Sequence, residues 1–328
     1  MECGLYAVMD GLLVCGNLNM DRILTVDYLP ESGQSTPVRK QRLEFGGCGG
    51  NISVSAAKLG TDVYLSSVVG RDLDPGYRKR LEHLGIDLSN LVVDPDLPSP
   101  FCIVLSAPNG EQAYAFMMGA MEKQSELNAE FRLGGPVRFC HIATSDPGFA
   151  NRTAGMMKEK GISTAFDPGQ EIYFRWKGGE VAEMLKRCDR FFGNLGEWQY
   201  LLDILDIQWE ERGGGGVVYP WSDSIFDLIG EAVVTLGDRG SMLLRKDRMV
   251  IVPAVDVDVV DATGAGDAFR GGFYSALLRG YPIEEALLFG NGMGALSITG
   301  SGPQGYEASW EKLEEILKNE WKKKWARI

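Results

Sequence analysis

The chain has 328 residues, of which 45% are hydrophobic and 24% are charged, as is ordinary for a soluble globular protein. Its net charge of −12 argues against a nucleic-acid partner, and no apolar run reaches the length of a membrane span. We expect a cytoplasmic protein, because the N-terminus lacks the basic segment of a signal peptide and the six cysteines are widely spaced, as reduced thiols are. We expect no zinc site, because the chain has only two histidines.

Short apolar runs alternate with helical patterns along most of the chain. The first strand is predicted at residues 11–21, and the first helix at 51–60, where Gly60 ends it. Further strands and helices follow at residues 62–70, 75–85, 138–145, 151–161, 163–169, 190–198, 231–240 and 241–253. This alternation predicts an α/β fold, a doubly wound and mostly parallel sheet with helices on both faces. The glycine run 213–216 is predicted to be a loop rather than a domain boundary.

Two segments, residues 22–45 and 98–120, interrupt this rhythm. Both alternate like exposed antiparallel strands, and the second contains the hairpin turn "PNGE". Each follows the end of a predicted strand, where a doubly wound sheet binds its ligands. We therefore expect the two segments to form a small β lid over the binding site.

Residues 259–269, "VVDATGAGDAF", place a carboxylate directly behind a run of small residues. The stretch is neither a Walker A loop nor a dinucleotide fingerprint, because GK[ST] does not follow and Phe269 stands where the third glycine would fall. One interpretation is a tight turn with a helix-capping Asp267. The other is an anion site of bare N–H groups beside a general base, an arrangement suited to phosphoryl transfer to an alcohol.

The stretch "DATGAGDAF" resembles the C-terminal signature of the ribokinase-like (PfkB) carbohydrate and nucleoside kinases. The stretch "GGCGGN" at 46–51 resembles the N-terminal signature of the same family, in the same order. Weaker family features stand between and around them, "GNLNMD", "NLGE", "TLGDRG" and "GNGMGALSITGSG". The resemblance spans nearly the whole chain. It implies a single ribokinase-like domain over residues 1–328 that uses ATP and Mg2+.

The resemblance also implies roles for individual residues. Asp267 would be the catalytic base, and Gly264, Ala265 and Gly266 would form the anion hole. The substrate would be bound by Asn19, Asp21, Gly46, Gly47, Asn51 and Asp167. The nucleotide would be bound by Asn194, Glu197, Thr235, Gly237 and Asn291, with Glu197 holding Mg2+ through water and Asn291 opening a helix beside the adenine. A monovalent cation such as K+ would be held by Asp261, Thr263, Ser297, Gly300 and Gly302.

Departures from the family leave the substrate open. Ribokinases proper tend to carry Lys where Cys48 stands, and the stretch "FDPGQEIYFRW" around Asp167 resembles relatives that act on keto-sugars or sugar acids. The lid residues Tyr114, Phe116, Met117 and Met118 either cover a nucleobase or pack against the lid of a second copy. The acceptor is thus the hydroxymethyl group of a sugar, a sugar acid or a nucleoside, and we expect a homodimer formed through the lid.

Three further interpretations stay open. Arg270 either reaches a phosphate or is solvated. The C-terminal residues 310–328 have helical periodicity and a basic end, which is typical of an amphipathic cover helix and also of a membrane-surface helix. The alternatives to an ATP-dependent kinase are an ADP-dependent sugar kinase and a non-catalytic sugar or nucleotide sensor on the same fold.

Overall fold

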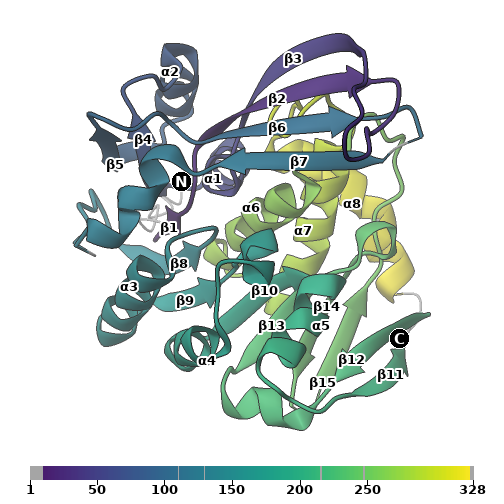
Figure 1. Cartoon of the computed structure of the whole chain (residues 1–328). Helices are drawn as coiled ribbons and strands as arrows, with labels where there is room; N and C mark the ends of the chain where they lie inside the picture. Colours follow the sequence, from purple (N-terminus) through teal and green to yellow (C-terminus); the bar gives the residue numbers. More distant parts are fainter. Residues whose placement is uncertain (1–9, 110, 129, 215, 247, 326–328) are drawn as a thin grey trace, which may run out of the picture.

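The computed structural model describes residues 10–325 except positions 110, 129, 215 and 247 (Figure 1). Within them the larger sheet has nine strands in the order β15-β14-β13-β10-β9-β8-β1-β4-β5. The strands from β5 to β13 are parallel to their neighbours, and β14 and β15 are added antiparallel. Their bounds are β1 Gly11–Cys15, β4 Val63–Gly70, β5 Asp87–Asp94, β8 Val137–Ile142, β9 Ser163–Phe166, β10 Arg190–Asn194, β13 Glu231–Thr235, β14 Ser241–Arg245 and β15 Arg248–Val252.

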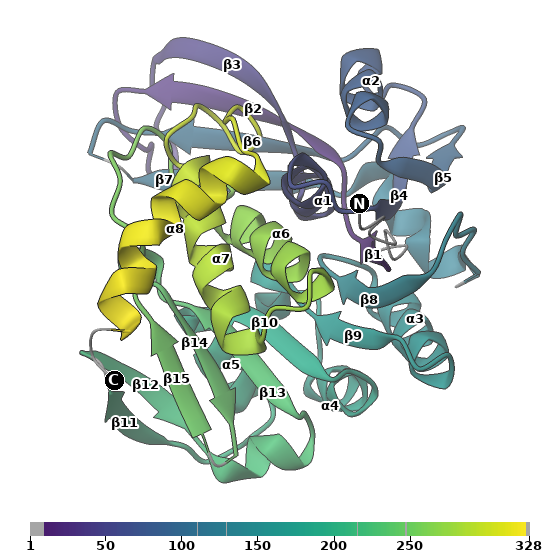
Figure 2. The ribbon, with the colours of Figure 1, turned by 180° about the vertical axis from the view of Figure 1, so that it is seen from behind.

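Helices cover both faces of this sheet, which Figures 1 and 2 show from opposite sides. Because side chains alternate along a strand, Leu12 and Val14 of β1 enter one core while Leu13 and Cys15 enter the other. The first core is covered by α1 Cys48–Lys58, α2 Pro75–His83, α6 Ala265–Leu278, α7 Ile283–Ser297 and α8 Trp310–Trp325. The second core is covered by α3 Pro147–Glu159, α4 Gly178–Arg187 and α5 Leu195–Ile204. The predicted fold class is therefore confirmed.

A separate four-stranded sheet, which we call the lid, has the order β3-β2-β6-β7 (Figure 1). Its strands are β2 Asn19–Val26, β3 Val38–Gly46, β6 Phe101–Ser106 and β7 Gln112–Met117, from the two segments that interrupt the alternation. Each segment forms an antiparallel pair as predicted, but β2 and β6 pair in parallel. That pairing joins segments about eighty residues apart, and no local pattern in the sequence indicates it.

Some predicted boundaries are wrong. Gly213 and Gly214 belong to strand β11 (Glu210–Gly214), which pairs with β12 (Val217–Trp221) in a small hairpin, so this part of the glycine run is not a loop. Gly215 lies outside the described residues. The described part of the chain also contains four 3₁₀ segments, η1 Gly119–Glu126, η2 Gly169–Tyr173, η3 Asp223–Asp227 and η4 Gly237–Arg239.

The C-terminal helix α8 covers another helix. Its residues Leu313 and Leu317 are fully buried and lie against Gly292 of α7. In the part of the chain that the structure describes, no helix is both long and apolar enough to cross a membrane.

Candidate active site

The run of small residues forms the N-terminal entry of α6. Gly264 is the N-cap and has a φ of 78°, a left-handed conformation that a residue without Cβ adopts at little cost. A Cβ on Gly264 would lie 2.6 Å from Cβ of Pro303, so the loop around Pro303 packs directly behind this turn. Asp267 lies in the first turn of the helix, as predicted. The N-terminus of α6 thus combines a helix dipole, bare backbone and a carboxylate.

Asp267 meets the other signature motif. Its Oδ2 accepts a hydrogen bond of 2.9 Å from Nδ2 of Asn51, which lies on α1 and is 216 residues away in the sequence. Burial raises the pKa of Asp267 to about 6, while Arg270 and the Asn51 hydrogen bond oppose that rise. The carboxylate is therefore mostly ionised at neutral pH and still more basic than an ordinary aspartate, which suits a general base.

A buried hydrogen-bonded chain orients the amide of Asn51. Nε2 of Gln304 donates to Oδ1 of Asn51 and to the hydroxyl of Tyr77, both at 2.9 Å, and Tyr77 donates to the carbonyl of Gly46 at 2.8 Å. Because the oxygen of Asn51 is engaged, its NH2 group faces Asp267. Sequence reasoning missed Gln304 and Tyr77. The only local signal for Gln304 was its place in the short stretch "GPQG", two residues after the expected cation residue Gly302.

The predicted acceptor residues follow β1 and begin β2. Nδ2 of Asn17 donates to Oδ1 of Asn19 at 2.9 Å, and Nδ2 of Asn19 donates in turn to Asp21. Burial raises the pKa of Asp21 to about 7, and the next cause is the charge of Asp267. The structure therefore brings the two carboxylates into one electrostatic environment, at the place where the lid meets the body.

Gly46 and Gly47 let the chain pass close to these side chains. A Cβ on Gly46 would overlap the carboxylate of Asp21, and one on Gly47 would lie 2.5 Å from the carbonyl oxygen of Asn17. Gly47 also has a φ of 91° and is the N-cap of α1. Gly47 therefore requires glycine for reasons of space and conformation, whereas a side chain at Gly46 would displace the carboxylate of Asp21.

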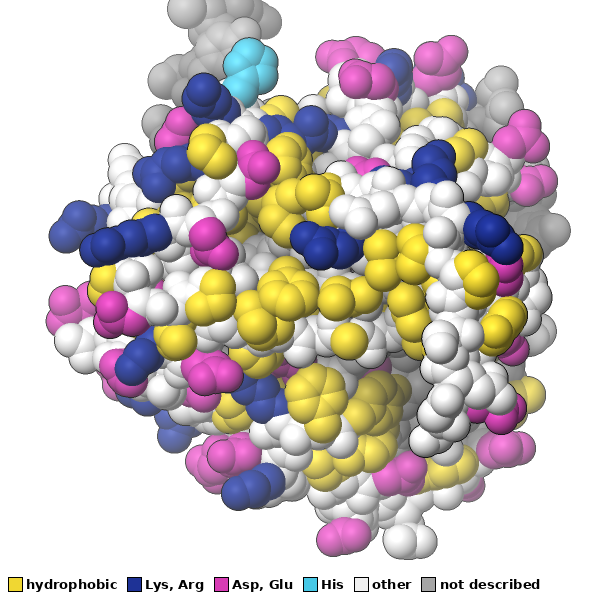
Figure 3. All heavy atoms as spheres, turned by 45° about the horizontal axis from the view of Figure 1, so that its top comes forward, with side chains coloured by type: hydrophobic (Ala, Val, Ile, Leu, Met, Phe, Trp, Pro, Cys, Tyr) yellow, Lys and Arg dark blue, Asp and Glu magenta, His cyan; other side chains and the backbone are white. Residues whose placement is uncertain are grey.

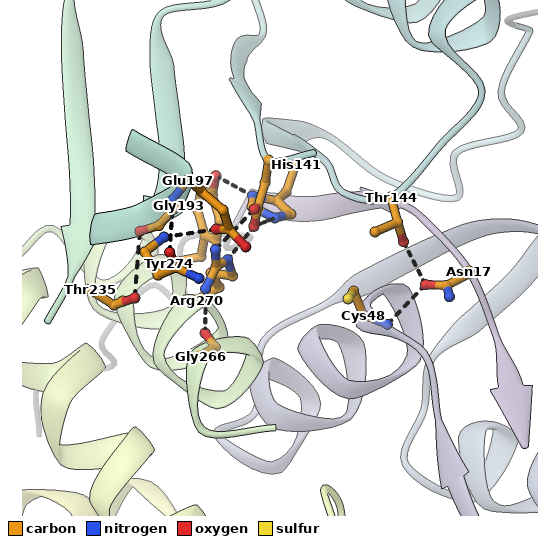
Figure 4. Close-up of polar contacts among 12 residues, drawn as sticks. Asn17, Cys48, His141, Thr144, Gly193, Glu197, Thr235, Gly266, Arg270 and Tyr274 are labelled. Carbon is orange, nitrogen blue, oxygen red and sulfur yellow. Dashed lines mark hydrogen bonds and ion pairs between the residues drawn. The ribbon is translucent and has the colours of Figure 1, made fainter. Parts of the chain in front are cut away.

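Cys48 opens α1 beside the base. Its backbone N–H donates to Oδ1 of Asn17 at 2.9 Å, and Thr144 donates to the same oxygen at 2.6 Å (Figure 4). Burial, followed by the charges of Asp267 and Asp167, raises the pKa of the Cys48 thiol well above its usual range. The site thus presents a neutral thiol at the position where ribokinases proper tend to have Lys.

Arg270, one turn after Asp267, is buried and paired (Figure 4). Its Nε and Nη2 donate to the carboxylate of Asp167, and its Nη1 donates to the carbonyl of Gly266 at 2.9 Å. The interpretation of a solvated Arg270 is therefore wrong. Asp167 follows β9 and is itself buried, so the protein occupies its carboxylate, and its predicted role in substrate binding stays a prediction.

His141 of β8 extends this buried chain. Nε2 lies 3.0 Å from Oδ2 of Asp167, and Nδ1 lies 3.0 Å from the hydroxyl of Tyr274. Burial lowers the pKa of His141, so the ring is neutral. Because the Asp167 carboxylate only accepts, we assign the proton to Nε2, and Tyr274 then donates to Nδ1. In the sequence analysis His141 served only as one of two histidines, too few to expect a zinc site, and it was given no role of its own.

The predicted nucleotide residues lie along the same sheet edge. Asn194 and Glu197 form a reciprocal capping box at the start of α5, with bonds of 2.9 and 2.8 Å. Burial and then the charge of Asp167 raise the pKa of Glu197, which lies beside Arg270 in Figure 4. Thr235 ends β13, and Gly237 follows it with a φ of 64°. These four residues therefore share one edge with the base.

Asn291 does not open a helix, because it lies inside α7, nine residues from Pro282 at the N-cap. Its Nδ2 donates to the carbonyls of Val252 and Pro253 at 3.0 Å each. The prediction about its position is wrong because the helical pattern begins earlier, at Ile283. Its role beside the adenine stays a prediction.

The residues expected to hold a monovalent cation are also placed. Oδ2 of Asp261 accepts from Nη2 of Arg42 at 2.7 Å and from the N–H of Gly302 at 3.1 Å, and Oδ1 accepts from the N–H of Thr263 at 3.0 Å. The N–H of Gly300 donates to the carbonyl of Ser297 at 3.3 Å. Sequence reasoning missed Arg42, which is 219 residues from Asp261 and belongs to the lid.

Comparisons with known proteins agree with this geometry. The model of the pfkB family of carbohydrate kinases matches residues 9–309. A nucleoside kinase of Methanocaldococcus jannaschii is 28% identical in sequence over 94% of this chain and 97% of its own length. The crystal structure of that kinase superposes with a TM-score of 0.83, covering 95% of this chain and 99% of that one. An ATP-dependent ribose-1-phosphate kinase of Halopiger xanaduensis is 30% identical over 89% and 93% of the two chains.

A third relative has been solved with a ligand. The nucleoside kinase of Burkholderia thailandensis in complex with inosine is 25% identical and has a TM-score of 0.82, covering 94% of this chain and 97% of that one. The resemblance carried by the two motifs is thereby confirmed.

Proposed function

Since this chain belongs to the pfkB family of carbohydrate kinases, we propose that it is an ATP-dependent nucleoside kinase that phosphorylates the hydroxymethyl group of the sugar. In this proposal residues 1–328 act as one domain, and residues 22–45 and 98–120 supply the lid. The observation that favours a nucleoside over a free sugar is the pair of exposed aromatic rings on the lid.

These rings lie on the lid face that carries Asp21. Along the register, Asp21 stands opposite Cys102, and Cys102 stands opposite Phe116, so their side chains share one face. Tyr114 is two residues before Phe116 on β7 and shares that face too. Tyr114 is 57% exposed and Phe116 is 38% exposed. Exposed rings beside an acceptor residue suit the flat face of a nucleobase, and this placement speaks against their packing on a second lid.

The charge of the acceptor region supports a neutral acceptor. This region contains three carboxylates, those of Asp21, Glu44 and Asp267. After burial, the charge of Asp267 is the next cause of the raised pKa of Asp21, and the charge of Glu44 raises it further. Cys48 adds no positive charge. A phosphorylated sugar or a sugar acid would bring its own negative charge into this region, whereas a nucleoside brings none. The relatives named nucleoside kinases, one of them solved with inosine, point the same way.

The chemistry follows from the site. Asp267 accepts the proton of the acceptor hydroxyl. Asp21 and Asn19 bind the other hydroxyl groups of the sugar and so hold the acceptor hydroxyl in place. The backbone N–H groups of Gly264, Ala265 and Gly266 stabilise the negative charge of the phosphoryl group as it moves. A mostly ionised base beside this turn argues against a non-catalytic sensor, which needs no base.

The nucleotide lies along the edge formed by β10 and β13, with Thr235 and Gly237 in its loop. Glu197 and Asn194 would hold Mg2+ through water. The donor chemistry fits, because carboxylate oxygens suit this ion. Burial first, and then the charge of Asp167, raise the pKa of Glu197, and a divalent cation nearby would favour its ionised form. When bound, Mg2+ neutralises charge on the phosphate oxygens. We assign ATP rather than ADP as the donor because ADP-dependent relatives usually have larger lids.

The outer face of the lid is the expected dimer contact. Leu43 alternates with Arg42 and Glu44 on β3, so it points to the face away from Asp21, where it is 54% exposed. Figure 3 looks onto this side of the molecule and shows hydrophobic side chains gathered across its middle. A homodimer through this face would cover them. Leu43→Asp should then lower the molar mass measured by light scattering from dimer to monomer.

A coupled kinase assay tests the proposed function. The wild-type protein is given ATP and Mg2+ with inosine, other nucleosides, ribose, ribose 1-phosphate and a sugar acid. The best nucleoside should exceed ribose in kcat/KM by roughly tenfold or more, the scale expected when one part of the substrate adds binding energy. A best rate with ribose, ribose 1-phosphate or the sugar acid would overturn the proposal.

A further inference from the structure

Arg42 connects the lid to the loops beside the anion hole. It lies on β3, where it stands opposite Ile23 and shares the face of Asp21. Its Nη2 contacts Oδ2 of Asp261 at 2.7 Å, and its Nη1 donates to Oγ of Ser301 at 2.8 Å. A single side chain thus links the lid to two loops of the body, one before Gly264 and one after α7.

These two loops define the position of the anion hole. Asp261 accepts the N–H of Thr263, directly before Gly264, and also the N–H of Gly302. Pro303, the next residue, packs behind Gly264. Asp261 therefore ties the turn of the anion hole to the loop that supports it, and any group bound to Asp261 acts on both.

A monovalent cation does not fit the residues around Asp261. Its carboxylate already has three protein donors, and one of them is a guanidinium. Burial raises the pKa of Asp261, but the hydrogen bonds from Thr263, Arg42 and Gly302 outweigh burial and hold it below its usual value. A potassium ion bound to the same carboxylate would meet the fixed charge of Arg42 at contact distance, and like charges repel.

We propose that Arg42 is a tethered cation, a positioning residue that supplies from the lid the positive charge expected from K+ at Asp261. The inference rests on the proposed kinase function. Two consequences follow. The enzyme needs no monovalent cation, and the loops beside Gly264 are fully braced only when β3 of the lid is docked. The same docking brings Asp21 over the acceptor site, so lid closure and the setting of the anion hole become one event.

The first experiment compares potassium chloride with tetramethylammonium chloride at equal ionic strength. The wild-type protein should show the same kcat within about twofold and the same midpoint of thermal unfolding in both salts, because a bound ion would stabilise the folded state in proportion to its occupancy. Stimulation of several-fold by potassium, or a higher midpoint in potassium, would overturn the proposal.

The second experiment uses Arg42→Ala, with Arg39→Ala as the matched control. Arg39 lies on the same strand but pairs with Asp27 inside the lid, at 2.6 Å. Arg42→Ala should lower kcat/KM by roughly tenfold, the scale of coupling between a moving element and a site. Arg42→Lys keeps a positive charge and should lower kcat/KM less than Arg42→Ala does. Arg39→Ala should change kcat/KM little. Equal behaviour of Arg42→Ala and Arg39→Ala would overturn the proposal.

A third readout does not depend on knowing the substrate. Hydrogen exchange of the peptides covering residues 258–264 and 298–305 should speed up in Arg42→Ala and stay as in wild type in Arg39→Ala. If the proposed substrate were wrong, the thermal and exchange measurements would still decide the role of Arg42. Unchanged exchange in both loops would show that Arg42 does not brace them, and would overturn the proposal.

Discussion

The two sides of the acceptor site are built in different ways. On the body side, Asn51 holds Asp267, and Arg270 and Asp167 belong to a buried network that reaches His141 on β8 of the large sheet. On the lid side, Tyr114 and Phe116 are exposed, and the link to the body through Arg42 and Asp261 is a partly exposed ion pair with side-chain exposures of 34% and 14%. Chemistry needs groups held in place before the substrate arrives, whereas a cover must move to admit it. We therefore expect the body to set the rate and the lid to choose the substrate.

The largest effect should come from the base. Asp267→Asn removes the group that accepts the proton but keeps a side chain of the same size next to Asn51. Turnover should fall by roughly 10²- to 10⁴-fold, the usual contribution of a positioned general base. Turnover is measured by the coupled assay, with circular dichroism and nucleotide binding as controls of the fold. Turnover like wild type in the folded variant would remove Asp267 from the mechanism.

Loss of Arg270 should produce the next largest effect, on stability. Arg270→Met leaves the carboxylate of Asp167 buried beside a neutral His141 without its cation. Removing one partner of a buried ion pair costs about 3–5 kcal/mol of unfolding free energy, measured by denaturant titration. Arg39→Ala, which breaks the exposed pair in the lid, should change the unfolding free energy little. Similar results for both variants would mean that the body is not the more rigid side.

The acceptor residue Asp21 connects the two sides. Asp21→Ala should raise KM for the nucleoside by roughly tenfold to a hundredfold, as expected for losing a hydrogen bond to a charged group, and leave KM for ATP nearly unchanged. Initial rates with each substrate varied in turn provide both values. Asp27→Ala, just beyond β2 on the exposed part of the lid, is the control. An equal change in both KM values would place Asp21 outside the acceptor pocket.

The pH profile should show the ionisation of the base. Asp267 must be ionised to accept a proton, and burial raises its pKa to about 6, so kcat/KM is lost as pH falls through about 6 and not only near 4. Below that value it should fall about tenfold per pH unit. Asp21, whose pKa burial raises to about 7, lies in the same field, so the observed values belong to the coupled pair. A flat profile between pH 8 and 5 would contradict this assignment.

Local patterns in the sequence predicted much of this organisation. The small residues before Asp267, the break in rhythm at the lid and the alternation of strands and helices are each visible within a dozen residues. Arg42 and Gln304 could not be predicted, because their partners Asp261 and Asn51 lie more than two hundred residues away. The parallel pairing of β2 with β6 was missed because the two strands are about eighty residues apart, beyond the reach of any local pattern. Asn291 was misplaced because glycines inside α7 resemble a helix entry.

The division between body and lid is tested most directly by the double variant Tyr114→Ala/Phe116→Ala, assayed with a nucleoside and with ribose. Each ring should contribute about 1 kcal/mol, so kcat/KM for the nucleoside should fall by roughly tenfold or more. The value for ribose, which has no base to cover, should stay near that of wild type. Leu43→Ala, on the outer face of the same sheet, should change neither. An equal fall for nucleoside and ribose, or no fall for either, would contradict the account.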